Sequence, residues 1–247
     1  MPAHDPFYDD PAFVRFYDPS EGWGPAFDAA MRLAEGAGSV LDLGCGTGVL
    51  AVALARTRRE VWGVDPAGAM LDVARERPGG AAVTWVEAPA QDFDLGRRFD
   101  LICMTGHAFQ CLLTEADRRA MLRRCAVHLA PNGRLIFDSW SPRRRVWGAW
   151  TPQRQRFEVE VDGVRALRWS DAAQDPVQGI VAYRSHVLIE GAAAPMTAVS
   201  RLAFPSREAL VADLAAADLH ADRWFGDWQG APWTPEAENI IPVARLD

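Results

Sequence analysis

The stretch from Ser39 to Gly48, SVLDLGCGTG, decides the fold. Its first five residues form a short apolar run, which predicts a buried strand, and a glycine-rich turn follows at once. A turn this tight needs glycine, because a side chain would block a positive φ angle or the approach of a ligand. The next residues, VLAVALART, predict a helix. A strand, a glycine turn and a helix in this order predict a doubly wound α/β fold.

The same alternation continues toward the C-terminus. Apolar runs at residues 60–64, 82–86, 99–104 and 134–137 predict four more strands, separated by helical segments and turns. Among the helix signals, Pro66 occupies a natural first helical position, and Thr114 begins a helix that ends at His128. A turn is expected at 131–133, before the fifth strand. Strands that alternate with helices predict a parallel sheet with right-handed crossovers.

The pattern changes after residue 139. Residues 153–204 have no strong helical period and contain alternating or β-branched runs separated by turn residues, which predict an antiparallel insertion. A helix follows Ser206, and residues 220–225 and 239–244 predict two last strands. We therefore expect an α/β fold, a doubly wound Rossmann-like sheet with an antiparallel β insertion between the fifth strand and the last helix.

Composition limits the class of protein. The chain has 247 residues and a net charge of −7, which disfavours partners rich in phosphate, such as nucleic acids and anionic membranes. All 26 basic residues are arginine. A chain without lysine is neither a P-loop ATPase nor a pyridoxal phosphate enzyme, because both need a lysine.

Features that would indicate export or a metal site are missing from the sequence. The start has no signal-peptide pattern and no apolar run approaches the roughly 20 residues that span a bilayer, so a cytoplasmic location without membrane contact is expected. The four cysteines form no CxxC pair and none pairs with a histidine at zinc-ligand spacing, so we expect free thiols and no metal.

The spacing of the glycines distinguishes two classes of ligand. Gly44, Gly46 and Gly48 form a GxGxG pattern. The dinucleotide fingerprint is GxGxxG, and its third glycine would fall where Val49 stands. The spacing therefore departs from the pattern of NAD-binding proteins, which disfavours a nicotinamide oxidoreductase.

Two aspartates beside these glycines indicate the charge of the ligand. Asp42 precedes the first glycine by two positions, where it would repel a pyrophosphate and attract a ligand with an ammonium and a sulfonium group. Asp65 closes the second strand, where an acidic side chain can accept hydrogen bonds from both ribose hydroxyls. S-Adenosylmethionine carries both cations and a ribose, and fits this pattern better than NAD does.

Four ordered motifs carry a resemblance to a known family: VLDLGCGTG (40–48), VWGVDPAGAML (61–71), EAPAQDF (87–93) and LAPNGRLIFD (129–138). They resemble the motifs of class I S-adenosylmethionine-dependent methyltransferases, closely over residues 39–138. The N-terminus and the tail resemble small-molecule members with a β insertion, such as sugar N,N-dimethyltransferases. The resemblance implies methyl transfer to a nitrogen or oxygen of a small-molecule acceptor by in-line displacement, with S-adenosylhomocysteine as product and no metal.

The resemblance also implies which residues bind the cofactor. The three glycines would wrap its methionine part, Asp42 would orient its amino group and Asp65 would hold its ribose. The full implied set is Asp42, Gly44, Cys45, Gly46, Gly48, Asp65, Pro66, Met70, Gln91, Asp92, Phe93, Met104 and Tyr17.

Several of these residues have a second interpretation. Met70 would pack on adenine, but methionine on an apolar helix face is as often core. Asp92 would accept from the adenine amine or simply lie in a solvated turn. Tyr8 and Tyr17 belong to a segment that either closes over the cofactor or forms a terminal strap.

His107 is the candidate catalytic residue. It follows the fourth strand, in a loop at the carboxyl edge of the sheet, where ligands bind in such folds. It could be a general base for an acceptor amine or hydroxyl, or a polar residue that only shapes the pocket.

Two further groups of residues have two interpretations each. The arginines at 143–145, 154 and 156 could bind an anion or form a solvated face. A set of tryptophans could form an acceptor pocket or a core: Trp140, Trp147, Trp150 and Trp169.

The resemblance implies a division of the chain: an N-terminal lid or helical segment at 1–38, a cofactor-binding core at 39–140, a substrate-capping insertion at 141–204 and completion of the sheet at 205–247.

Alternative functions stay open. The protein could bind S-adenosylmethionine without catalysis, or methylate RNA or protein. Residues 104–107 lack the Asn/Asp-Pro-Pro-aromatic motif of base-amine methyltransferases and the acidic ligands of catechol-type enzymes. The acceptor and the oligomeric state, a homodimer included, are not fixed by the sequence.

Overall fold

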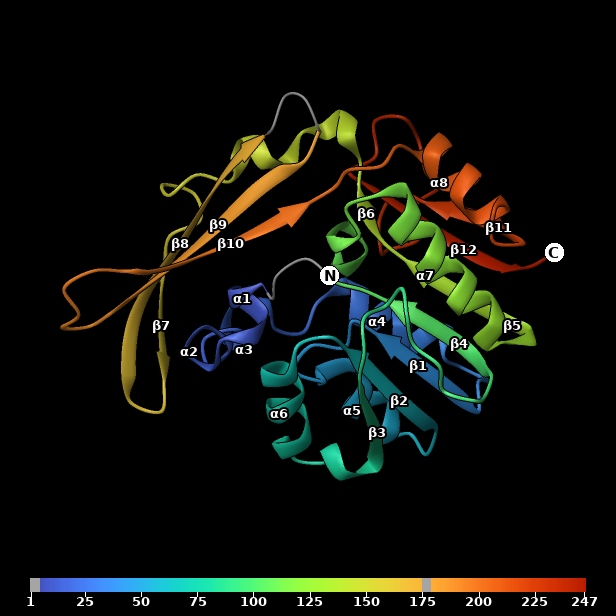
Figure 1. The fold of residues 1–247 in the computed structure, drawn as a ribbon, viewed down its shortest axis with the longest axis horizontal. Helices are drawn as coiled ribbons and strands as arrows, with labels where there is room; N and C mark the ends of the chain where they lie inside the picture. Colours follow the sequence, from blue (N-terminus) through green and yellow to red (C-terminus); the bar gives the residue numbers. More distant parts are fainter. Residues whose placement is uncertain (1–4, 175–178) are drawn as a thin grey trace.

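The predicted strand at 39–43 lies inside a mixed eight-stranded sheet in the computed structural model, which describes residues 5–174 and 179–247 (Figure 1). The strand order is β11-β12-β5-β4-β1-β2-β3, with β6 paired to β12. Strands β1 to β5 pair in parallel, and β12 runs antiparallel to β5. The strands are β1 (Ser39–Leu43), β2 (Glu60–Asp65), β3 (Val83–Glu87), β4 (Phe99–Met104), β5 (Leu129–Phe137), β6 (Ser139–Trp140), β11 (Leu219–Phe225) and β12 (Asn239–Leu246). The Rossmann-like sheet is confirmed.

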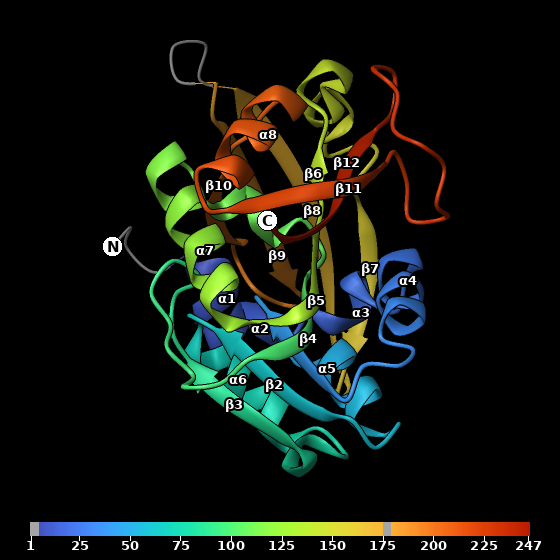
Figure 2. The ribbon, with the colours of Figure 1, turned by 90° about the vertical axis from the view of Figure 1, so that its right-hand side faces the viewer.

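Helices cover both faces of this sheet (Figure 2). One apolar core lies under α7 and α8 and the other under α4 and α5. Serine and threonine begin two of these helices as expected, because the Thr114 hydroxyl accepts from Asp117 N–H and the Ser206 hydroxyl from Ala209 N–H. The elements are α4 (Pro25–Leu33), α5 (Val49–Ala55), α6 (Gly68–Glu76), α7 (Glu115–His128), α8 (Arg207–Ala215) and the 3₁₀ turns η1 (Gly80–Ala82), η2 (Ala108–Cys111), η3 (Pro142–Arg144) and η4 (Val146–Ala149).

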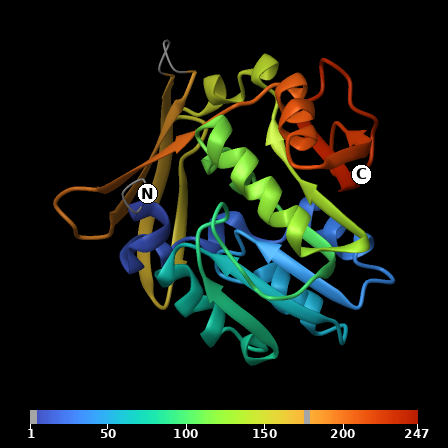
Figure 3. The same cartoon turned by 45° about the vertical axis from the view of Figure 1, so that its right-hand side comes forward.

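The predicted insertion is a second, four-stranded antiparallel sheet of order β10-β9-β8-β7. It projects from the doubly wound part, and the N-terminal helices lie between the two (Figure 3). Its strands are β7 (Phe157–Val161), β8 (Val164–Gln174), β9 (Val181–Ile189) and β10 (Met196–Leu202), and the N-terminal helices are α1 (Pro6–Asp9), α2 (Pro11–Val14) and α3 (Asp18–Glu21). The insertion between β5 and α8 is therefore confirmed.

Phenylalanines of the N-terminal helices form the apolar layer between the two sheets. Phe7, Phe13 and Phe16 are buried against one face of the four-stranded sheet, where they contact Val159, Ala166, Val187 and Ala198. On the other side Val14 is buried against Ala67 and Met70 at α6. The first 17 residues, as far as the structure describes them, thus connect the insertion to the doubly wound part.

Two local expectations were wrong. Residues 131–133 do not form a turn before the fifth strand, because β5 already begins at Leu129 and shifts its register on β4 between Phe99 and Leu101. Gly133 permits this, since a Cβ there would stand 2.8 Å from the Phe99 carbonyl oxygen. Pro66 is not the first helical residue. Asp65 Oδ1 accepts from Ala67 N–H at 2.9 Å, which makes a short turn, and α6 begins at Gly68.

No helix among the described residues combines the length and the apolar character that crossing a bilayer requires.

Candidate active site

The glycine turn between β1 and α5 adopts a left-handed backbone at all three glycines, with φ of 72°, 51° and 76° at Gly44, Gly46 and Gly48. Each glycine meets a different environment. A Cβ at position 48 would stand 2.4 Å from the Trp85 ring, and one at position 44 would stand 3.0 Å from the Ala108 Cβ. No atom lies within 4 Å of a Cβ at position 46. Packing alone therefore explains Gly48, whereas Gly46 borders open space that a ligand could fill.

Asp65 connects the end of β2 to the glycine turn. Its side chain is buried, with 7% exposed, and its Oδ2 accepts from Gly46 N–H at 2.8 Å. Its Oδ1 accepts from Ala67 N–H. Each carboxylate oxygen keeps a second lone pair, which could accept from a ligand hydroxyl.

Asp42 is a second buried carboxylate beside this turn, with 2% exposed. Burial, followed by the charge of Asp65, raises the pKa of Asp42 to about 7. Burial likewise raises the pKa of Asp65 to about 6, although the Ala67 and Gly46 N–H groups oppose the shift. No arginine forms an ion pair with either carboxylate in the part of the chain that the structure describes. Two adjacent acids without a basic partner suit a cationic ligand.

The N-terminal segment covers the side of α6 that faces this pair. Met70 is buried against Val14 and Ala67, and Tyr8 and Tyr17 pack beside them. Asp18 holds the segment in place, since its carboxylate accepts from the Thr47 hydroxyl and pairs with Arg77. The expected adenine position at Met70 is therefore enclosed by residues of α1 to α3.

The other residues of the implied cofactor set occupy varied positions. Met104 is buried near Gly44, and the Cys45 sulfur lies below the turn, 2.9 Å from a Cβ at Gly63. Pro66 is exposed, as is Asp92, which sits in a turn whose N–H donates to the Pro89 carbonyl. Gln91 is half-buried beside it.

The Phe93 side chain is buried, with 2% exposed. Its ring lies in the main core, 4.7 Å from the His128 ring. The structure thus brings together Asp42, Asp65, the glycine turn, Met70 and Tyr17. For all of these residues the cofactor role stays a prediction.

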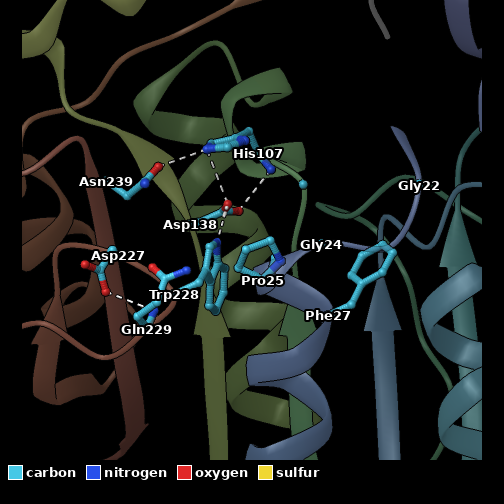
Figure 4. A pocket seen from close by; sticks show the side chains of 12 residues that line it. Gly22, Gly24, Pro25, Phe27, His107, Asp138, Asp227, Trp228, Gln229 and Asn239 are labelled. Atoms are coloured by element: carbon cyan, nitrogen blue, oxygen red, sulfur yellow. Dashed lines mark hydrogen bonds and ion pairs between the residues drawn. The ribbon is translucent and has the colours of Figure 1, made fainter. Parts of the chain in front are cut away.

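His107 follows β4 in a left-handed conformation, with φ of 60°, which is uncommon for a residue other than glycine. Its N–H donates to Asp138 Oδ1 at 3.0 Å. Its ring Nε2 lies 3.0 Å from Asn239 Oδ1 and 3.4 Å from Asp138 Oδ2. Figure 4 shows the three side chains converging at one end of a cavity.

This cavity has a volume of about 330 Å³. The start of α4 forms one wall, Gly106 and His107 a second, and Trp228 of the loop between β11 and β12 a third (Figure 4). Its ionisable lining residues are His107, Asp138 and Asp227; no arginine lines it. The cavity therefore favours neutral or cationic ligands.

Aromatic rings continue from His107 toward the insertion. The Trp140 indole stacks on the His107 ring, with centroids 3.6 Å apart, and Trp150 contacts Trp140 at 5.0 Å. Trp147 packs on Phe204, whereas Trp169 stacks on His186, in the four-stranded sheet. Three of the four tryptophans therefore gather between the sheets. The arginines at 143–145, 154 and 156 are exposed.

Sequence reasoning missed Asp138, Asn239, Trp228 and Asp227. One signal was available for Asp138, an acid that directly follows an apolar run, as Asp65 does at the end of β2. Among residues 5–174 and 179–247, no group of three or more His, Cys, Asp or Glu side chains is placed to hold a metal ion.

The residues present fit S-adenosylmethionine. Open space at Gly46 could accept the methionine part of the cofactor. The neighbouring carboxylates of Asp42 and Asp65 suit its positive charges. The remaining lone pairs of the Asp65 carboxylate suit the ribose hydroxyls. Met70, the expected adenine contact, is only 1% exposed because Val14 and Ala67 pack against it.

Comparison with known proteins agrees with this fit. Residues 40–133 match the family model described as a methyltransferase domain. The N-terminal methyltransferase of cypemycin from Streptomyces sp is 35% identical over 104 residues, 42% of this chain and 42% of that protein. The N,N-dimethyltransferase of dTDP-3-amino-3,6-dideoxy-α-D-glucopyranose from Streptomyces fradiae is 34% identical over 104 residues, 42% of this chain and 40% of that protein. The matched segment thus spans about two fifths of these relatives.

A solved structure extends the likeness over almost the whole chain. An amino pentose methyltransferase from Micromonospora echinaspora, solved with bound S-adenosylmethionine, is 27% identical, with a TM-score of 0.67 over 91% of this chain and 93% of that one. The chain therefore contains a methyltransferase domain built on the class I fold of S-adenosylmethionine-dependent methyltransferases.

Proposed function

We propose that this protein transfers a methyl group from S-adenosylmethionine to the nitrogen of a small-molecule amine. The observation that carries the proposal is the close approach of Gly44 to Ala108, the residue after His107, since a Cβ at position 44 would stand 3.0 Å from the Ala108 Cβ. It places the glycine turn directly beside the loop that lines the cavity. A cofactor on the turn and an acceptor in the cavity would therefore be neighbours.

The residues that would hold the cofactor are Asp42, Asp65 and the turn around Gly46, with Met70 and Tyr17 at the covered side. When bound, S-adenosylmethionine supplies a methyl group on a sulfonium, which is already activated for displacement by a nucleophile. The protein then needs mainly to align the acceptor and exclude water. The segment of α1 to α3 that encloses Met70 supports water exclusion.

The charge of the cavity supports an amine as acceptor. Asp138 and Asp227 line it without an arginine, so an ammonium group would be attracted. An ammonium has no lone pair and must lose a proton before it can attack. His107 is the base of the cavity and would take that proton. Two similar proteins, the N-terminal methyltransferase of cypemycin and the amino pentose methyltransferase, support the same acceptor by their names.

The test is formation of S-adenosylhomocysteine from S-adenosylmethionine with matched acceptors, an amino sugar and the sugar with a hydroxyl in its place. We expect turnover with the amine and a loss in kcat of about 10²–10⁴ for His107→Ala. His186→Ala is the matched control, because this histidine pairs with Asp171 in the four-stranded sheet and should leave turnover unchanged. Turnover with the hydroxyl sugar alone would contradict the proposal that the acceptor is an amine. If the protein bound neither S-adenosylmethionine nor S-adenosylhomocysteine, the whole proposal would be contradicted.

A further inference from the structure

Asp138 is completely buried at the end of β5, and its carboxylate contacts groups from two other segments. Oδ1 accepts from the His107 N–H, and Oδ2 accepts from Trp228 Nε1–H at 3.3 Å. Oδ2 also lies 3.4 Å from His107 Nε2. No arginine pairs with Asp138 in the described ranges, so its only ionisable contact there is the imidazole.

The neighbours of Nε2 determine which ring nitrogen of His107 carries the proton. A carboxylate oxygen can only accept, so Nε2 faces the carboxylate favourably only when it carries hydrogen. Asn239 presents its oxygen to the same atom at 3.0 Å, which agrees with a donating Nε2. If the amide were turned, Nε2 would direct a lone pair at the carboxylate, which is repulsive. The carboxylate therefore selects the Nε2–H form.

In this form the free lone pair of the imidazole is on Nδ1. No described residue is hydrogen-bonded to Nδ1, and the His107 side chain is 22% exposed where it lines the cavity. Trp140 covers one ring face at an interplanar angle of 15°. The ring is thus fixed along one edge by Asp138 and Asn239 and over one face by Trp140.

We propose that Asp138 is a positioning residue that holds His107 in its Nε2–H form, so that Nδ1 is the atom that takes the proton from the acceptor. This inference rests on the proposed function. In the proton transfer, the ammonium N–H bond breaks, its electron pair stays on the acceptor nitrogen, and the proton bonds to Nδ1. The resulting imidazolium keeps its Nε2–H bond to Asn239 Oδ1 and forms an ion pair with the Asp138 carboxylate, which offsets its new charge.

The experiment uses Asp138→Asn, which keeps the shape of the side chain and replaces one acceptor oxygen by an NH₂ donor. The new NH₂ would donate to Nε2, and the ring proton would move to Nδ1. Ring ¹⁵N shifts of histidine-labelled full-length protein, read at a pH of about 8.5 where imidazoles are neutral, report this form directly. His107→Gln identifies the His107 signals. We expect Nε2–H in the wild type and Nδ1–H in the variant.

Kinetics with the amino sugar provide the second measurement. Asp138→Asn should lower kcat by about 10²–10⁴ while the Kd of S-adenosylmethionine stays within about twofold. Asp213→Asn is the matched control, because Asp213 is a buried carboxylate that binds Arg118 and Arg119 and does not line the cavity. It should lower stability without moving the His107 shifts or kcat.

The outcomes separate this inference from the proposed function. An Nδ1–H wild type, or a variant that changes form and keeps its kcat, would overturn the role of Asp138 while methyl transfer stands. If Asp138→Asn does not fold, Asn239→Leu tests the same point, because it removes the second acceptor and leaves Asp138 at Nε2. This variant should retain the Nε2–H form, and an Nδ1–H form in it would contradict the proposal. Failure of the wild type to bind the cofactor would instead contradict the proposed function.

Discussion

The Gly46 N–H donates to Asp65 Oδ2 across 2.8 Å, and this bond joins the turn after β1 to the end of β2. The bond holds the glycine turn in place, and Gly46 in this turn borders open space. The bond uses only one lone pair of Asp65 Oδ2. One carboxylate therefore both shapes the turn and remains able to accept from a ligand.

Asp65→Ala should weaken binding of S-adenosylmethionine and S-adenosylhomocysteine by about 1–3 kcal/mol, or roughly 5- to 150-fold in Kd, because ribose hydroxyls lose their acceptor. Isothermal titration calorimetry measures this. Asp100→Ala is the control, since Asp100 accepts from Ser39 and Gly38 at the opposite end of β1. Equal Kd values for Asp65→Ala and the wild type would remove Asp65 from the cofactor site.

Asp42→Asn should stabilise the ligand-free protein at pH 8 but not at pH 4. The first pH lies above the pKa of about 7 that Asp42 has in the folded protein, and the second lies close to the ordinary aspartate pKa of 3.8. Burial and the charge of Asp65 raise the pKa of Asp42 from 3.8 to about 7, so the folded state holds the proton more tightly than the unfolded state. Between these values, rising pH therefore favours unfolding of the wild type, and asparagine, which cannot ionise, avoids this loss. Urea unfolding at both pH values checks the prediction. A stability difference that does not grow with pH would show that the carboxylate is not buried as described.

Gly48→Ala should lower the free energy of unfolding by at least about 2 kcal/mol, because overpacking costs about 1–3 kcal/mol and a left-handed alanine about 1–2 kcal/mol. The added Cβ would stand 2.4 Å from the Trp85 ring. Gly36→Ala is the control for the cost of placing alanine in a left-handed conformation, since Gly36 has φ of 81° and an added Cβ there would meet no atom within 4 Å. Chemical denaturation should find Gly48→Ala the more destabilising; equal losses would mean that Trp85 moves aside freely.

Asp18→Ala should speed release of S-adenosylmethionine. Asp18 joins the N-terminal segment to Thr47 in the glycine turn and to Arg77 after α6, so its loss frees the cover over Met70. We expect the dissociation rate to rise several-fold in stopped-flow measurements, with a smaller change in association. Asp72→Ala, which removes an exposed pair with Arg75, serves as the control. An unchanged rate would show that the segment does not retain the cofactor.

The doubly wound part was predictable because local signals and the sheet pairing agree there. Buried parallel strands appear as apolar runs, and the residues at their ends, such as Asp65, fall at one edge by topology. The insertion was also predictable, because alternation of apolar residues is a local property of strands.

The cavity was not predictable to the same degree. Asp138 and Asn239 are 101 residues apart in the chain, and they meet at His107 only because β12 runs antiparallel beside β5. The sequence likewise does not indicate that the Phe93 ring lies against His128 in the core, and the cofactor role of this residue stays a prediction. In both cases tertiary packing, which no short stretch encodes, determines where the side chain lies.

The phenylalanines at 7, 13 and 16 have a consequence for engineering hybrid enzymes. The apolar face of the four-stranded sheet is completed by these residues and not by the insertion itself. A swap of residues 141–204 between two homologous proteins would therefore join a sheet to a foreign hydrophobic partner. To transfer acceptor preference into this protein, the first 17 residues must be exchanged together with the insertion, although more than 120 residues separate the two segments in the sequence.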